Sequence, residues 1–600
     1  MVEQPSRRSF LYTSSLLGAS ALAGCGQRAT TSDEENSTDV KTRSSTGSSE
    51  ATARSAPTIA GRLNRTGIVH GESVTVTISI ENPADSAVTQ VLPITVDSQQ
   101  LQSREVTVAP DETTSVEVSV TPPDTGTQTV TAAGKEVGTV VVRAERPDTV
   151  RDVGVHYYPW YGAPLHNWND GAWSNESPST PVLGNYDSTD SDVIEQHIDW
   201  CRQAGVSWLN VSWWGRHSGH DRRIQQDLLA HPRADELDWS ILYETTGRLG
   251  SDPVEFDGGV AQHTFIDDLT YLADTYFQRD AYKRIDGRPV LYIWVAQNLR
   301  GDVQAAYETA VEEAGVRPYL IADIPAQSGL DSNPVTDIAD AVTTYSVYST
   351  GEPTRDAFIE TARSSYRSWY RATEYVDVDL IPTAAPGFDD TEITHVYRDN
   401  DPVPSAPAIY EETANAARRY ADGPVLVTSF NEWYEDTQIE PSEEHGTAYL
   451  DITADSIAAK EREAPTFDGE TFTLSFDRTV AESTMNPNIE NGRQFTFMLH
   501  QLTIRDERDS VVLDADIGSS ADDVSFILGS YGPEQSDDTT WRWLGGGTET
   551  VVAVPSVPES GQIELTGLGA GEMTVTLEVD GQSTDTTTIT DQSDTYSLST

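Results

Sequence analysis

Eight apolar runs of strand length, separated by segments with helical periodicity, limit the fold of this chain more than any other feature. Residues 190–204, 303–314 and 411–420 repeat apolar side chains at the spacing of a helix that buries one face. Strands that alternate with helices form parallel β/α units, and eight such units close a (β/α)8 (TIM) barrel. We therefore predict a TIM barrel over residues 149–462. Its strands are expected at residues 153–158, 207–213, 239–243, 290–294, 319–323, 341–347, 380–385 and 425–430.

Period-two alternation replaces this pattern on both sides of the barrel. Residues 57–148 alternate apolar and polar side chains between short turns, which is typical of an immunoglobulin-like β-sandwich. Residues 463–600 do the same and predict a second β-sandwich. The first is interpreted as a spacer in preference to a binding module. The second fits an accessory packing domain and a glycan-binding domain equally well. The predicted chain is thus multidomain, a central TIM barrel flanked by N-terminal and C-terminal β-sandwiches.

The first 25 residues have the features of an export signal. Residues 6–11 resemble a twin-arginine signal, and residues 22–25 resemble a lipoprotein box. That resemblance implies lipidation of Cys25 and an extracellular protein, anchored to the outer face of the cell membrane by this lipid. An ordinary signal with a chance cysteine is the alternative. Residues 26–56 are rich in Ser, Thr and acidic side chains and predict a disordered tether.

The composition is strongly acidic, with 96 Asp and Glu against 39 Lys and Arg and a net charge of −57. Such a chain repels nucleic acid and anionic lipid, so no nucleic-acid partner is expected and membrane contact only through the lipid anchor. The carboxylates are spread along the whole chain. This spread indicates a protein of a halophile, because high salt screens the repulsion between the carboxylates. The alternative is an acidic surface that only maintains solubility.

Active sites of TIM barrels lie at the C-terminal ends of the strands. There this sequence gathers aromatic rings and carboxylates. Aromatic faces stack on the C–H faces of sugars and carboxylates accept hydroxyl protons, so the predicted partner is an oligosaccharide or polysaccharide. No His and Cys cluster suits a metal, and no cofactor is expected. The candidate substrate-binding residues are Tyr157, Tyr158, Trp160, Tyr161, Trp213, Trp214, Glu244, Tyr292, Trp294, Asn431, Trp433, Tyr434 and Gln438.

Glu432 and Glu435 are the candidate catalytic residues, because cleavage of a glycosidic bond normally uses two carboxyl groups. They lie three positions apart, directly after the last predicted strand. In a helical turn this spacing brings the Cβ atoms to about 5–6 Å, near the separation of a retaining pair. A solvated acidic loop is the alternative.

Residues 429–441 resemble the last-strand motif of glycoside hydrolase family 99, which comprises endo-α-mannosidases and endo-α-mannanases. Residues 157–162 and 211–214 resemble the first two strand motifs of that family, and Glu244 stands where it has a substrate-binding acid. The resemblance covers about residues 149–455. It departs from the family motif Glu-Trp-His-Glu-Gly at Tyr434 and Asp436, which puts mannose specificity in doubt.

The resemblance implies a retaining reaction in which the substrate 2-hydroxyl attacks the anomeric carbon and forms a 1,2-anhydro sugar. Glu432 would be the base for that hydroxyl. Glu435 would protonate the leaving oxygen and then activate water. Two alternatives stay open: a non-catalytic cell-surface protein that binds glycans, and an enzyme of surface-polysaccharide assembly. The natural glycan, its linkage and the oligomeric state are not predicted.

Overall fold

The computed structural model describes residues 57–64, 67–124, 126–143, 149–162, 173, 177–250, 253–326, 328–347, 354–393, 401–463, 465–467, 469–486, 493–517, 524–536 and 539–600. The predicted signal and tether, with Cys25, lie outside these residues. The described chain forms two compact units, one up to Arg146 and one from Pro147 onward. The predicted domain boundaries at residues 148 and 462 stay predictions.

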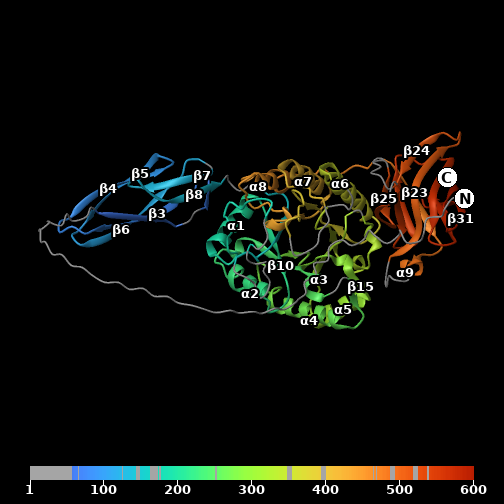
Figure 1. The fold of residues 1–600 in the computed structure, drawn as a ribbon, viewed down its shortest axis with the longest axis horizontal. Coiled ribbons are helices and arrows are strands. Elements are labelled where there is room, and N and C mark those ends of the chain that lie inside the picture. The colour runs from blue at the N-terminus through green and yellow to red at the C-terminus, as the bar shows by residue number, and fades with distance from the viewer. Residues whose placement is uncertain are drawn as a thin grey trace, which may run out of the picture. The chain divides into compact units, whose positions relative to one another are not determined.

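Parallel strands form the centre of the second unit (Figure 1). The strand order is β18-β17-β16-β14-β11-β10-β9-β20-β19. Only Ile381 and Pro382 separate β18 from β19, so both ends of the path meet in one segment and the sheet curls into a TIM-barrel-like domain. The strands are β9 (Val153–Tyr157), β10 (Trp208–Trp213), β11 (Asp238–Tyr243), β14 (Arg288–Ile293), β16 (Tyr319–Asp323), β17 (Ala341–Thr343), β18 (Asp379–Leu380), β19 (Thr383–Ala384) and β20 (Val425–Val427).

Three observed strands are shorter than the sequence predicts by two residues or more, and each has an identifiable cause. Pro382 has no N–H to donate and divides the seventh strand into β18 and β19. The sixth strand, β17, ends at Thr343, because the N–H of Tyr345 donates to the Asp323 side chain. The eighth strand, β20, ends at Val427, and the N–H of Ser429 turns to the carbonyl of Thr437 instead.

Helices accompany the barrel strands, and side chains cap several of them. Asp190 caps α1 by accepting from the N–H of Asp192, and Asp302 caps α5 in the same way. Gly315 ends α5 at a φ of +65°, which glycine adopts without steric cost. The helices are α1 (Ser191–Gln203), α2 (Gly219–Arg223), α3 (Thr245–Leu249), α4 (Val260–Thr275), α5 (Val303–Ala314), α6 (Arg355–Ala372), α7 (Pro407–Tyr420) and α8 (Ala448–Ile452), with small strands β12 (Val254–Phe256), β13 (Arg284–Ile285) and β15 (Leu299–Gly301).

The first unit is a β domain with a three-stranded sheet, β1-β3-β6, and a five-stranded sheet, β2-β8-β7-β4-β5. Alternate residues of β3 and β4 are buried in one common core, as period-two alternation requires. The strands are β1 (Thr58–Leu63), β2 (Gly67–Val69), β3 (Val74–Asn82), β4 (Val88–Val96), β5 (Gln99–Val108), β6 (Glu112–Val120), β7 (Gly126–Ala132) and β8 (Lys135–Arg143).

The C-terminal part of the second unit is a β domain with sheets of five and seven strands. Its β25 meets the barrel, where Ser368 of α6 donates to the carbonyl of Phe526 and the N–H of Gly529 donates to Asp331. Its elements are β21 (Glu470–Phe476), β22 (Val480–Ala481), α9 (Glu482–Met485), β23 (Gln494–Asp506), β24 (Val511–Asp516), β25 (Ser525–Leu528), β26 (Ser530–Ser536), β27 (Thr539–Gly545), β28 (Glu549–Val554), β29 (Gly561–Gly569), β30 (Met573–Val579), β31 (Gln582–Ile589) and β32 (Asp594–Ser599).

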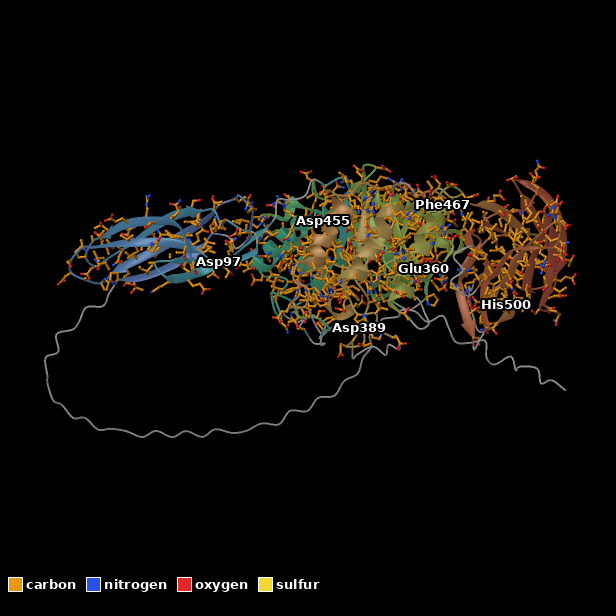
Figure 2. All side chains as sticks on the ribbon, turned by 90° about the horizontal axis from the view of Figure 1, so that it is seen from above. Asp97, Glu360, Asp389, Asp455, Phe467 and His500 are labelled. Atoms are coloured by element: carbon orange, nitrogen blue, oxygen red, sulfur yellow. The ribbon has the colours of Figure 1, made fainter. Side chains whose placement is uncertain are left out.

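Acidic side chains are exposed in both units. Asp97 of the first unit and Asp455 of the barrel are two of them (Figure 2). In the described part of the chain, no helix has the length and apolarity needed to cross a membrane.

Candidate active site

The loop after β20 carries the two candidate catalytic carboxylates. Its base is closed by backbone hydrogen bonds from Ser429 to Thr437 (2.7 Å) and from Glu440 to Phe430 (2.8 Å). Within the loop, Trp433–Glu435 form one 3-10 turn, and Glu432 caps it by accepting from the N–H of Tyr434 (3.2 Å). Glu435 therefore lies in a helical turn, whereas Glu432 stands at its N-cap with a non-helical backbone (φ −85°, ψ 84°).

Two contacts attach this loop to the end of β9. The Asn431 side chain accepts from the N–H of Tyr158 (2.8 Å) and donates to its carbonyl (3.0 Å). The N–H of Trp433 donates to the hydroxyl of Tyr161 (3.0 Å). Since a side-chain amide that pairs with both backbone groups of one residue fixes distance and direction, the loop is held at the rim of the barrel.

Glu435 is half-buried at the end of a relay of tyrosine hydroxyls. Tyr158 donates to the hydroxyl of Tyr345 (3.0 Å), which donates to Oε2 of Glu435 (2.8 Å). Burial raises the pKa of both tyrosines well above the ordinary value, and Glu435 raises it further. Both hydroxyls therefore keep their protons and act as donors, and the relay ends on Oε2 of Glu435.

Glu244, directly after β11, is buried and accepts a hydrogen bond from Ser212 (2.7 Å). Burial raises the pKa of its carboxyl to about 8, and the nearby charges of Glu435 and Asp323 add to this. Burial also raises the pKa of Asp323 to about 7, although the N–H groups of Val295 and Tyr345 donate to it. At neutral pH, Glu244 is therefore mainly protonated and can donate a hydrogen bond.

Partly exposed aromatic rings adjoin these carboxyl groups. The Trp160 ring packs on Tyr158 at 4.5 Å between centroids and approaches Trp214 at 6.4 Å. The indole of Trp214 donates to Ser212, the donor to Glu244. Trp294 adds another partly exposed ring, 6.5 Å from Tyr345. Rings beside paired carboxyl groups suit the stacking of a sugar on an apolar face.

Residues 165–456 match the model of glycosyl hydrolase family 99. This protein is a glycoside hydrolase. It is 26% identical over 335 residues to mouse glycoprotein endo-alpha-1,2-mannosidase, covering 49% of this chain and 69% of the relative. It is 25% identical to human glycoprotein endo-alpha-1,2-mannosidase-like protein, with 50% and 71% covered. Among solved structures, a GH99 endo-alpha-mannosidase from Bacteroides thetaiotaomicron is 24% identical with a TM-score of 0.40, and 51% of this chain and 97% of that chain are covered.

Several residues of the hydrolase predicted to contact substrate lie instead in its core. Tyr157 points to the helices, where its hydroxyl meets Nδ1 of His197 (3.0 Å), and Trp213 donates to Asp221 (2.9 Å). The indole of Trp433 and the side chain of Gln438 are fully buried. For these four residues the predicted sugar contact is corrected, because their side chains bind other parts of the protein.

The remaining predicted substrate-binding residues differ in how deeply their side chains are buried. Asn431 and Tyr161 are fully buried and support the loop, and Tyr292 lies in the interior of the barrel with its ring 4.8 Å from His156. The hydroxyl of Tyr292 has no hydrogen-bond partner among the described residues. Residues in or beside the cluster of partly accessible rings and carboxyls are Tyr158, Trp160, Trp214, Glu244, Trp294 and Tyr434.

Two residues near the carboxylates were missed by the sequence analysis. The apolar pattern places Tyr345 inside the predicted strand 341–347 and Asp323 at the end of the predicted strand 319–323. Asp323 ends a predicted strand, so a reading of every strand end includes it. Tyr345 follows β17 only because that strand ends early, at Thr343.

Asp436 has a role different from the one its place in the motif suggests. At a φ of +51° it occupies the left-handed region, which Asp tolerates better than most residues. Its carboxylate accepts from Ser179 (2.9 Å), Gln438 (3.1 Å) and the N–H of Ser405 (2.8 Å). It therefore joins three loops and is only 3% exposed.

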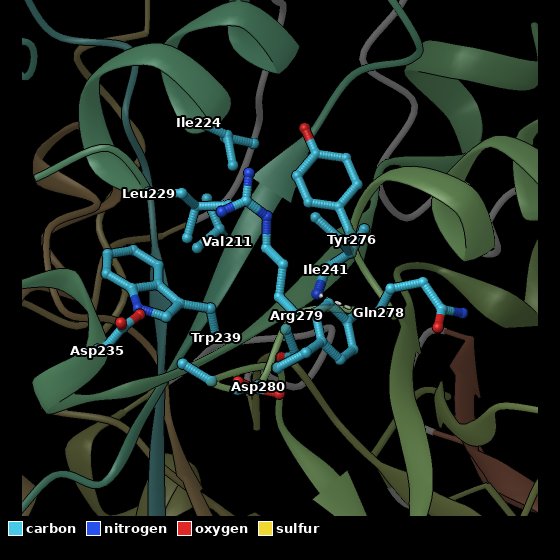
Figure 3. Close-up of a pocket in the computed structure, with 13 residues that line it drawn as sticks. Val211, Ile224, Leu229, Asp235, Trp239, Ile241, Tyr276, Gln278, Arg279 and Asp280 are labelled. Carbon is cyan, nitrogen blue, oxygen red and sulfur yellow. Dashed lines mark hydrogen bonds between the residues drawn. The ribbon is translucent and has the colours of Figure 1, made fainter.

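Among the described residues, no cluster of His, Cys, Asp or Glu could hold a metal ion. A cavity of about 320 Å³ lies beside β10 and β11, with Trp239, Arg279 and Asp280 in its lining (Figure 3). It shares no residue with the rim described above.

Proposed function

We propose that this hydrolase is endo-acting and retaining, and that it cleaves α-linked, mannose-type glycans at Glu432 and Glu435. The observation that carries the proposal is the loop after β20, which holds both carboxylates on one capped turn beside the Tyr158–Tyr345 relay. The curated relatives with endo-alpha-1,2-mannosidase in their names support the bond type and the endo mode.

In the proposed first step, Glu432 takes the proton of the substrate 2-hydroxyl as that oxygen attacks the anomeric carbon. Glu435 gives its proton to the glycosidic oxygen as the bond to the leaving sugar breaks. In the second step, Glu435 takes a proton from water, which attacks the anomeric carbon of the 1,2-anhydro sugar. The ring opens, and O2 recovers its proton from Glu432.

The surroundings give the other residues supporting roles in this proposal. The hydroxyl of Tyr345 orients Glu435 through Oε2, one of its two carboxyl oxygens. Protonated Glu244 donates to a sugar hydroxyl, which an ionised carboxylate could not do. Trp160, Trp214 and Trp294 provide the faces on which sugar rings stack.

The test is a panel of α-mannans and other α-linked glycans at molar salt, with product sizes read by mass spectrometry. Endo cleavage gives oligosaccharides, and Glu435→Gln should lose hydrolysis by at least about 100-fold, since general acid catalysis is removed. Glu443→Gln is the matched control, because Glu443 is exposed in the same segment. Wild-type protein that binds these glycans without cleaving them would favour the glycan-binding alternative.

We also propose that the enzyme acts outside the cell in high salt, anchored by a lipid on Cys25. The net charge of −57 and the signal-like first 25 residues support this. Labelling with a radioactive lipid precursor in a haloarchaeal host tests it, since Cys25→Ser should abolish the label and release the protein into the medium. Labelled Cys25→Ser protein would refute the anchor.

A further inference from the structure

Glu440 is a fully buried carboxylate five residues after Glu435. Its Oε2 accepts from the indole Nε1 of Trp433 (2.9 Å) and from the hydroxyl of Tyr186 (2.8 Å). Its Oε1 lies 3.2 Å from Nε2 of His197 on α1. One side chain thus joins the catalytic loop, the segment after β9 and a helix of the outer layer.

The chemistry of these partners requires an acceptor at position 440. The indole N–H of Trp433 can only donate, and the Tyr186 hydroxyl donates to Glu440 while it accepts from Asn431 (3.3 Å). His197 can donate through Nε2 when its Nδ1 accepts from Tyr157 (3.0 Å). A buried donor without an acceptor costs free energy of folding. Without the Glu440 carboxylate, the Trp433 indole, the Tyr186 hydroxyl and His197 would therefore no longer be held in their present positions.

Trp433 makes this buried carboxylate relevant to the reaction. It stands between Glu432 and Glu435 on the 3-10 turn, and its own N–H is bound to Tyr161 (3.0 Å). The indole bond to Glu440 is the second anchor of the same residue. Trp433 is the first residue of this turn, directly after Glu432 and two residues before Glu435. Its two anchors therefore determine where both carboxylates point.

We propose that Glu440 is a positioning residue, which fixes the direction of Glu432 and Glu435 by holding the Trp433 indole. This inference rests on the proposed function of the two glutamates. Glu440 itself touches no substrate, because it is sealed beneath Trp433 and Tyr186. Its loss should therefore lower kcat and leave KM nearly unchanged.

The experiment compares three variants of the full chain on an α-mannan oligosaccharide that the wild type cleaves, well below each variant's melting temperature. Glu440→Ala removes the acceptor. A displacement of about 1 Å at a reacting group costs about 100-fold, so we expect that loss in kcat with KM within about twofold. Glu440→Gln should restore most of the activity, because its amide oxygen still accepts from Trp433 and Tyr186. Its amide nitrogen can then face His197 in the other tautomer.

His197→Leu is the matched control. It removes a donor to the same carboxylate but leaves the contacts to the catalytic loop in place. It should lower the melting temperature much as Glu440→Ala does, with a change in kcat of less than about threefold. A loss of kcat that follows stability alone, equal in both variants, would overturn the positioning role.

Hydrogen exchange of the loop amides gives a second readout that does not depend on activity. In Glu440→Ala, amides of residues 431–436 should exchange about tenfold faster than in wild type, and in His197→Leu they should not. Unchanged exchange in Glu440→Ala would refute the proposal, even if no glycan is cleaved. If the wild type cleaves no glycan but the loop amides exchange faster in Glu440→Ala, the proposed function is wrong. The contact from Glu440 to Trp433 then still holds the loop in place.

Discussion

The protonated state of Glu244 predicts an unusual pH dependence for the stability of the barrel. The pKa of the Glu244 carboxyl is raised from 4.5 to about 8, mainly by burial. A carboxyl with a raised folded-state pKa takes up a proton on folding between these two values. The stability that this proton provides is complete below pH 4.5 and is lost as the pH rises through 8. Glu244→Gln, which cannot ionise, should lose none of it.

The magnitude follows from the difference between the two pKa values. Above pH 8 the ionised Glu244 costs the wild type about 5 kcal/mol relative to its protonated form. For a barrel of roughly 300 residues this corresponds to a melting temperature lower by about 8 °C. The pKa of Asp323 is raised to about 7, but this residue is present in both proteins and its effect largely cancels.

The assay is calorimetry of wild type and Glu244→Gln between pH 4.5 and 9 at constant high salt. The melting temperatures should lie closest near pH 4.5 and diverge as the pH rises, with Glu244→Gln about 5–10 °C higher at pH 9. Glu443→Gln, the same substitution at an exposed position, should run parallel to wild type throughout. Parallel curves for wild type and Glu244→Gln would refute the protonated state and the donor role proposed for it.

Two further predictions follow from the contacts around the loop, and a third follows from the net charge. Tyr345→Phe removes the donor to Glu435 and should lower kcat about 10–100-fold with an unchanged circular dichroism spectrum; a wild-type rate would exclude the relay. Asp436→Gly suits the left-handed backbone but loses the contacts to Ser179 and Ser405, so its barrel should melt lower by about 2–5 °C, whereas Asp436→Asn should lose less. The net charge of −57 predicts that the melting temperature rises between low and molar NaCl, and a fall in differential scanning fluorimetry would contradict the halophilic interpretation.

The strand positions could be predicted because each barrel strand is a separate apolar run between polar loops. The starts of all eight expected strands lie within two residues of the observed ones, as for β9 at Val153 and β16 at Tyr319. The errors are at the ends of strands, where a single contact determines the last residue of the strand. Pro382 divides the seventh strand, and the hydrogen bond from Tyr345 to Asp323 stops β17 early. The proline is a local signal, but the hydrogen bond joins residues 22 positions apart and has none.

The choice among aromatic residues could not be made from the sequence, for a reason specific to parallel barrels. Neighbouring residues of a strand face opposite sides. Both sides of these strands are buried, one in the barrel interior and one beneath helices, so both faces carry large side chains. Tyr157 and Trp213 face the helices, whereas the partly exposed Trp214 follows the end of β10. Only the packing of α1 and α2 distinguishes them.

The charge states show most clearly what depends on the fold. Glu244 is one of 96 acidic residues, and although the sequence places it after a predicted strand, nothing in its sequence neighbours indicates its protonation state. Its raised pKa comes from burial and from Glu435 and Asp323, residues that reach it only when the strand ends meet at one rim. Glu440 has the opposite environment, with donors from three segments around an acceptor. A glutamate side chain is therefore a hydrogen-bond donor at position 244 and a hydrogen-bond acceptor at position 440. The proposed chemistry at the rim of the barrel requires both.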